Sequence, residues 1–168
     1  MTNQCTRHYR PLQFELCRAY KRSNDTMPGN KAPHASSVAV HNSMIANKRR
    51  DTKPEIVVRQ MLREMGYKGY RLDWKKAPGH PDIAYPGKKI AIFVHGCFWH
   101  RCPRCNLPMP KTHQEYWIPK LERNVQRDEE NTRRLTEDGW LVIVIWECQI
   151  NDDSDKVRAI LRNALQTR

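Results

Sequence analysis

Apolar and polar residues recur with helical spacing in three parts of the chain. Between residues 52 and 65, apolar side chains return every three or four positions, directly after Thr52, which suits a helix N-cap. Glu55 stands three residues later, so the two side chains can form a capping box. The same period covers residues 114–137, on a more polar background, and residues 154–165. Three helices are therefore expected.

Short apolar runs of strand length lie between these helices, at residues 70–72, 83–85, 90–94 and 141–146. The Pro-Gly-Lys sequence at residues 86–88 predicts a hairpin between the second and third runs. If this hairpin turns on residues 87–89, Asp82 pairs opposite Val94, and the His95 side chain lies close to the Asp82 carboxylate. The order of the elements predicts an α/β fold with a mixed central sheet flanked by helices.

The first 41 residues show no sustained apolar period. Residues 23–37 are rich in Asn, Pro, Gly and Ser, a composition typical of segments without a packed core. We therefore expect a flexible basic N-terminal arm over residues 1–41 and one folded domain over residues 42–168.

The net charge of the chain limits the classes of partner that it is expected to bind. Thirty Lys and Arg against 18 Asp and Glu give a formal net charge of +12, which favours a polyanion, with nucleic acid as the first candidate. No window approaches the roughly 18 consecutive apolar residues of a spanning helix, and the first 20 residues do not resemble a signal peptide. We expect a monomer that is not bound to a membrane, in a bacterial-type cytoplasm and associated with the nucleoid.

Four of the six cysteines form a pattern with metal-ligand spacing: Cys97, Cys102, Cys105 and Cys148. In a reducing compartment such closely spaced cysteines bind metal more often than they form disulfides, and four sulfurs suit a closed tetrahedral zinc site. His100 or His113 could replace one sulfur. Two disulfides, inert thiols, or a nucleophile pair of Cys97 and His100 are the alternatives. Cys5 and Cys17 lie in the arm and are expected to be free.

Asp82, His95, His100 and Asp128 are candidates for hydrolytic chemistry. Asp82 directly precedes a predicted strand, where a carboxylate can hold a hard cation such as Mg²⁺. An imidazole can accept a proton from water at neutral pH when a partner fixes its tautomer, and Asp128 could be that partner for His100. The structural alternatives are a turn aspartate at Asp82, a zinc-associated His100 and a solvated Asp128.

Three large aromatic residues lie near the cysteines: Phe98, Trp99 and Trp117. They could belong to the core. However, two adjacent aromatic residues on a loop cannot easily point the same way, so at least one could stack on bases or wedge between them.

Several motifs together resemble the very short patch repair (Vsr) endonucleases, over residues 44–150. They are Asp-Thr-Lys-Pro-Glu at 51–55, Pro-Gly-His-Pro-Asp at 78–82, Phe-Val-His-Gly-Cys-Phe-Trp-His at 93–100, Lys-Thr at 111–112 leading to Trp117, Asn-Val-Gln-Arg-Asp at 124–128 and residues 140–148. The resemblance implies a fold related to type II restriction enzymes. It also implies a Mg²⁺-dependent single-strand cut in duplex DNA, on the 5′ side of the thymine of a T:G mismatch such as deamination of 5-methylcytosine produces. Mismatch-repair proteins would be possible partners.

The resemblance also implies roles for individual residues. Asp82 and the backbone carbonyl of Val94 would bind Mg²⁺, His100 would be the base, oriented by Asp128, and His95 and Glu55 would hold metal-bound waters. The DNA wedge would be Phe98, Trp99 and Trp117, and the zinc ligands Cys97, Cys102, Cys105 and Cys148. Val94 and Cys102 stand where a well-known form of the motif has threonine and histidine.

Two other functions fit the same residues. One is a nickase of a defence or modification-dependent system that shares the fold but ignores mismatches. The other is a zinc-stabilised DNA-binding module without activity, against which the set Asp82, His100 and Asp128 argues.

Overall fold

The computed structural model describes residues 33–34, 37–38, 42, 45, 48 and 50–167. These residues belong to the second of two compact units, which spans Pro33–Arg168. The arm predicted over residues 1–41, with Cys5 and Cys17, lies outside the described residues except at positions 33–34 and 37–38.

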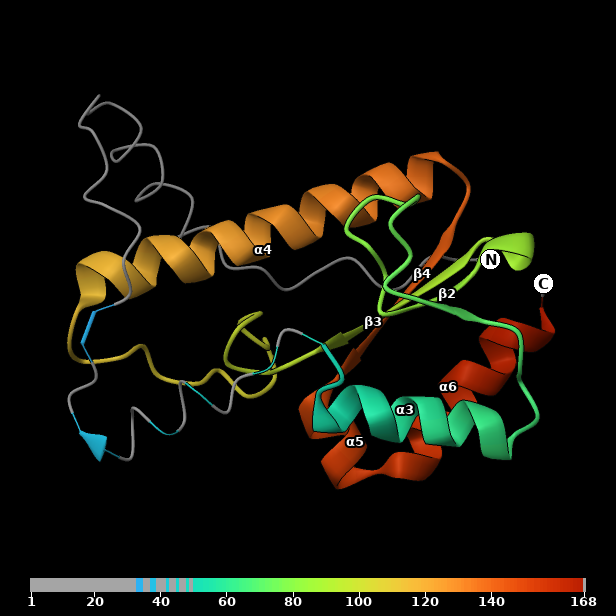
Figure 1. The fold of residues 1–168 in the computed structure, drawn as a ribbon, viewed down its shortest axis with the longest axis horizontal. Helices are drawn as coiled ribbons and strands as arrows, with labels where there is room; N and C mark the ends of the chain where they lie inside the picture. Colours follow the sequence, from blue (N-terminus) through green and yellow to red (C-terminus); the bar gives the residue numbers. More distant parts are fainter. Residues whose placement is uncertain are drawn as a thin grey trace. The chain divides into compact units, whose positions relative to one another are not determined.

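The centre of the domain is a four-stranded mixed sheet (Figure 1). Its strands are β1 (Arg71–Leu72), β2 (Ile83–Tyr85), β3 (Ile90–His95) and β4 (Leu141–Trp146), in that order across the sheet. β1, β2 and β3 pair antiparallel, whereas β3 and β4 pair parallel. A parallel pair needs a crossover connection, and α4 (Gln114–Glu137) provides it. The predicted mixed α/β architecture is confirmed.

The pairing of β2 with β3 corrects the register that the sequence suggested. Tyr85 pairs with Ile90, and Ile83 with Ile92, so Asp82 is in register with Phe93 and the predicted pairing with Val94 was wrong by one residue. The connection holds four residues because Pro86, which lacks an N–H for the sheet, starts a 3₁₀ turn. Lys89 closes this turn in the left-handed conformation, at φ 49°.

Side chains of β3 alternate between two hydrophobic clusters. Ile90, Ile92 and Val94 pack in the larger cluster, which contains residues of α3 (Lys53–Glu64) and α6 (Ser154–Gln166). Ala91 and Phe93 pack on the opposite side, with Leu135 of α4. Since successive strand residues point to opposite faces, the sheet is covered by α3 and α6 on one face and by α4 on the other (Figure 1).

The helices follow the predicted periods closely. α3 begins after Thr52, and the capping box with Glu55 is present. α4 has the predicted bounds, and α6 ends one residue later than expected. The short helix α5 (Glu147–Asp152) was not predicted, and it places Cys148 in a helical turn after β4 rather than at the end of the strand. No helix in the described part of the chain is long and apolar enough to cross a membrane.

Candidate active site

Asp82 stands directly before β2 and turns its carboxylate toward the end of β3. The Val94 backbone N–H donates to Asp82 Oδ2 at 2.7 Å, so these two residues lie together despite the shifted register. Burial raises the pKa of Asp82 from 3.8 to about 6, and the hydrogen bond from Val94 offsets part of this rise. Among the described residues no cationic side chain lies at hydrogen-bond distance from this largely buried carboxylate, which is therefore suited to a metal cation.

His95, His100 and Asp128 form a second group beside Asp82. His95 ends β3 and is 8% exposed, and its ring stacks on that of His100 with 3.9 Å between centroids. His100 Nδ1 lies 2.5 Å from Oδ2 of Asp128, which belongs to α4. One ring nitrogen of each histidine and one carboxylate oxygen of Asp128 lie within 4.8 Å of one another. The predicted closeness of the His95 side chain to the Asp82 carboxylate stays a prediction, and both residues line the same pocket.

The contact with Asp128 fixes what His100 can do. A carboxylate only accepts hydrogen bonds, so Nδ1 carries the proton and Nε2 is left as an acceptor when the ring is neutral. Burial lowers the pKa of His95 to about 4, so His95 is neutral near pH 7. The pair therefore combines one oriented acceptor with one neutral imidazole.

Glu55 is held on α3 by its own capping contacts. Glu55 Oε1 accepts from the Thr52 hydroxyl at 2.8 Å, and Oε2 accepts from the Asp51 N–H at 3.0 Å. Oε1 also accepts from the Thr52 N–H at 3.4 Å, whereas Oε2 can accept a further hydrogen bond, so these contacts orient the group without saturating it.

All six residues with a predicted catalytic or Mg²⁺-binding role line one open pocket of about 950 Å³: Glu55, Asp82, Val94, His95, His100 and Asp128. Sequence reasoning gave no role to the other charged residues of this pocket, among them Asp51, Arg59 and Glu147. Arg59 could have been found, because it stands four residues after Glu55 and therefore on the same helix face. Glu147, whose Oε2 accepts from the Cys97 N–H at 3.4 Å, depends on the unpredicted α5.

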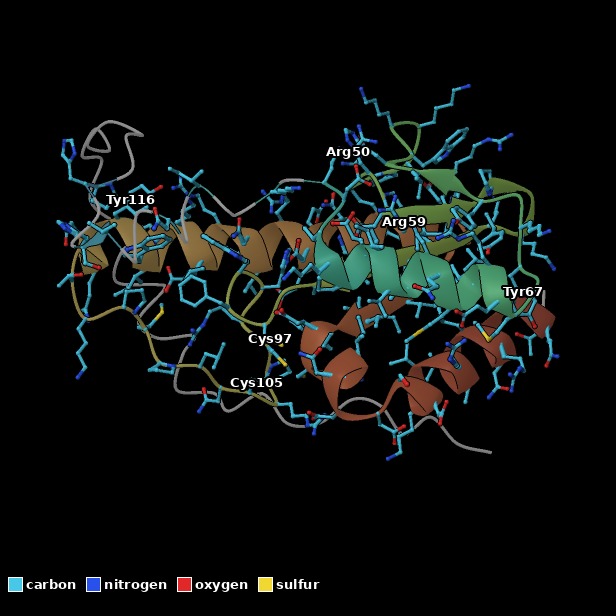
Figure 2. The ribbon with its side chains drawn as sticks, turned by 60° about the horizontal axis from the view of Figure 1, so that its bottom comes forward. Arg50, Arg59, Tyr67, Cys97, Cys105 and Tyr116 are labelled. Carbon is cyan, nitrogen blue, oxygen red and sulfur yellow. The ribbon has the colours of Figure 1, made fainter. Side chains whose placement is uncertain are left out.

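The four predicted cysteines converge beside this pocket. Their sulfur atoms lie within 4.8 Å of one another, and the Cys102 and Cys148 sulfurs are 3.8 Å apart. Cys97 and Cys105 come from one loop (Figure 2), whereas Cys148 comes from α5. The four are free cysteines, so the disulfide alternative is not borne out.

Neither histidine suggested as a substitute ligand belongs to this cluster. His100 contacts Asp128, and His113 lies 3.5 Å from Glu115. The alternative of a nucleophile pair is also disfavoured, because burial raises the pKa of the Cys97 thiol and its thiolate is the reactive form.

The three predicted wedge residues pack together at one side of the pocket. Phe98 and Trp99 meet edge to face with 5.1 Å between centroids, and Trp117 of α4 lies 5.9 Å from each. All three are only partly buried, and Lys120 lies over the ring of Trp117 at 5.3 Å. Asn124 of α4 donates to the Trp99 carbonyl at 3.1 Å. This hydrogen bond attaches the loop with the aromatic residues to α4.

Comparison with known proteins shows to which family the chain belongs. The family described as DNA mismatch endonuclease Vsr matches residues 37–106. The type II nicking enzyme V.XorIIP of Xanthomonas oryzae pv. oryzae is 42% identical over 117 residues, which are 69% of this chain and 84% of that protein. V.NaeI, a type II nicking enzyme of Lentzea aerocolonigenes, is 44% identical over 62% of this chain and 65% of its own length. The DNA mismatch endonuclease Vsr of Escherichia coli is 37% identical over 60% of this chain and 64% of its own length. The chain therefore belongs to the Vsr family of DNA endonucleases.

Proposed function

We propose that this endonuclease cuts one strand of duplex DNA on the 5′ side of the thymine in a T:G mismatch, with Mg²⁺ as cofactor. The observation that carries the proposal is the convergence of Asp82, Val94, His95, His100 and Asp128 on one open pocket beside a cluster of partly exposed aromatic rings. The relatives named as nicking enzymes and as a mismatch endonuclease support it. We also propose that the sheet and its helices are related to the restriction-endonuclease fold.

Asp82 and the Val94 carbonyl would hold Mg²⁺. The fit is chemical, because Mg²⁺ prefers oxygen ligands and the buried Asp82 carboxylate gains from a cation that neutralises it. When bound, Mg²⁺ would stabilise the negative charge that develops on the phosphate and on the leaving oxygen. His95 and Glu55 would orient water around the cation.

His100 would act as the general base. Its Nδ1 is engaged by Asp128, so Nε2 can take a proton from the attacking water. The water oxygen then bonds to phosphorus, the bond from phosphorus to the 3′ oxygen breaks, and this oxygen takes a proton from a solvent water molecule and leaves as a 3′-hydroxyl. The other end keeps a 5′-phosphate.

The cysteine cluster would hold a structural zinc ion. Sulfur atoms about 2.3 Å from a tetrahedral metal lie about 3.8 Å apart, which agrees with the separation of the Cys102 and Cys148 sulfurs. Four thiolates leave no open position, so this site would fix the loop between β3 and α4 without entering the reaction.

Mismatch preference would come from Phe98, Trp99 and Trp117. Unstacking a mismatched base step costs less free energy than unstacking a paired one, and aromatic side chains inserted at the step convert this difference into selectivity. A nickase without mismatch preference is the second candidate, because V.XorIIP and V.NaeI are named only for nicking. A DNA-binding module without activity does not need the oriented His100.

The test is an assay of strand nicking on two duplexes that differ only in one T:A or T:G pair. Each strand carries its own label, and each reaction is run with Mg²⁺ and with a chelator. We expect one Mg²⁺-dependent cut, in the thymine strand of the T:G duplex. Equal cutting of both duplexes would favour the second candidate, and no cutting under any condition would refute the catalytic proposal.

A further inference from the structure

Arg59 is an arginine in the wall of the active-site pocket that the proposed reaction does not yet use. It follows Glu55 by four residues on α3, so the two side chains lie on one helix face, and both line the pocket. Only 14% of the Arg59 side chain is exposed, compared with 58% for Arg50 at the same pocket (Figure 2).

One carboxylate holds Arg59 in place. Arg59 Nη2 donates to Asp51 Oδ1 at 2.7 Å, and among the described residues this is its only hydrogen bond. Asp51 is fixed in turn, because its N–H donates to Glu55 and its backbone adopts a left-handed conformation at φ 56°. The guanidinium is therefore oriented by the same short segment that caps α3.

Most of the hydrogen-bonding capacity of Arg59 is left over. A guanidinium has five N–H donors, and Asp51 engages one nitrogen. In the described part of the chain, the only buried side-chain nitrogen without a partner belongs to Arg101, so the other Arg59 nitrogens reach the solvent of the pocket. The Arg59 side chain thus offers free donors, and it lines the same pocket as Asp82 and His100.

The charges of the pocket indicate which ligand these donors suit. Its lining includes six carboxylates, Asp51, Glu55, Asp73, Asp82, Asp128 and Glu147, and five basic side chains, Lys48, Arg50, Lys53, Arg59 and Arg127, and of these five Arg59 alone is not exposed. Such a pocket repels a DNA phosphate unless fixed cations offset the repulsion. A structural ion pair is the alternative role for Arg59, but Asp51 is 60% exposed, and ion pairs with exposed partners contribute little to stability.

We propose that Arg59 binds a non-bridging oxygen of a backbone phosphate next to the cut, with Asp51 as its positioning residue. This inference rests on the proposed function for the identity of the ligand. A planar guanidinium can donate two parallel hydrogen bonds to a phosphate, and a lysine at the same position cannot. From its position on α3, Arg59 would fix the register of the bound DNA strand. The residues on the sheet side of the pocket would take part in the reaction itself.

The test combines protein variants with DNA in which single phosphates are neutral. Full-length wild type, Arg59→Gln and Arg59→Lys bind a fluorescent T:G duplex without divalent metal, and the affinities are measured by anisotropy at fixed salt. Arg63→Gln is the matched control, because Arg63 is an exposed arginine of the same helix outside the pocket. We expect Arg59→Gln to weaken binding about tenfold, Arg59→Lys to weaken it less, and Arg63→Gln to change it less than twofold.

The decisive measurement replaces each phosphate near the mapped cut with a methylphosphonate, one at a time. At the phosphate that Arg59 contacts, neutralisation should weaken wild type about tenfold and Arg59→Gln hardly at all. Arg63→Gln should lose the same factor as wild type at every phosphate. If neutralisation weakens binding by Arg59→Gln as much as binding by wild type at every phosphate, the effects of the two changes are additive. That result would overturn the inference.

Two controls separate this outcome from other failures. Melting temperature and zinc content show whether Arg59→Gln folds; if it does not, Asp51→Asn replaces it, with an expected threefold loss at the same phosphate. Wild-type protein that cuts normally while the losses stay additive contradicts only the role of Arg59. Wild-type protein that never cuts contradicts the proposed function instead.

Discussion

One stretch of chain supplies two sites with different properties. Residues 95–105 send His95 and His100 into the open pocket, and Cys97, Cys102 and Cys105 into the sulfur cluster. The four sulfurs lie within 4.8 Å of one another, whereas the histidines border an open pocket of about 950 Å³. The comparison teaches that the direction of each side chain on a tight loop assigns neighbouring residues to two separate groups, one of thiols and one of imidazoles.

The largest expected effect concerns the closed site. Cys148→Ser should lose the single zinc ion per chain and lower the free energy of unfolding by more than about 5 kcal/mol, because structural zinc binding contributes directly to folding. Metal analysis and thermal unfolding measure this. Cys17→Ser, which alters a cysteine predicted to be free, should keep both properties. Full zinc content in Cys148→Ser would remove this residue from the ligand set.

A change in the open site should affect catalysis and leave folding intact. Asp82→Asn should slow nicking about 10⁴-fold, which is about 5 kcal/mol in activation free energy, because the amide cannot replace the charge that holds Mg²⁺. Single-turnover nicking measures the rate, and zinc content should stay at the wild-type value. Substantial activity in this variant would contradict the assigned Mg²⁺ site.

The pair of His100 and Asp128 should show graded losses. His100→Ala removes the base and should slow nicking about 10³-fold, whereas Asp128→Asn only weakens the orientation of the ring and should cost about tenfold. Rates of both variants are compared at saturating Mg²⁺. Equal losses would mean that Asp128 does more than orient the imidazole.

The raised pKa of Asp82 predicts that the ionised carboxylate proposed for activity lowers the stability of the metal-free protein. The folded protein holds the Asp82 proton more tightly than the unfolded chain does, since the pKa rises from 3.8 to about 6. This contribution to stability is complete below pH 3.8 and is lost as the pH rises through about 6. Without divalent metal, Asp82→Asn should therefore stabilise the protein by up to about 2 to 3 kcal/mol at pH 7.5 and hardly at pH 4.

Denaturant unfolding at both pH values checks this prediction. Glu129→Gln is the control, because it removes an exposed carboxylate of α4. Equal effects of Asp82→Asn at pH 7.5 and pH 4 would show that its carboxylate is not penalised by burial.

The smallest effect concerns recognition. Trp117→Ala should reduce the preference for T:G over T:A nicking about tenfold while changing affinity for the matched duplex less than twofold. Affinity for the matched duplex should fall steeply with salt in both proteins, because phosphate contacts supply it. A variant that loses affinity for both duplexes equally would make Trp117 a general DNA contact.

The local elements of this fold could be read from the sequence. The capping box at Thr52 and the bounds of α4 depend on contacts between residues three or four positions apart, and both were predicted correctly. The cysteine spacing indicated the set of four residues that the fold brings together. Such features are determined locally, so neighbouring residues contain the necessary information.

Only the tertiary structure decided how these elements face one another. The register between β2 and β3 depends on one extra residue in the Pro86 turn, and the stacking of His95 on His100 depends on the path of the loop after β3. The position of Arg59 in the pocket depends on how α3 packs on the sheet, since the sequence gives the helix face but not what lies opposite. These contacts join residues far apart in the chain, where a shift of one residue or a small rotation of a helix changes which groups meet.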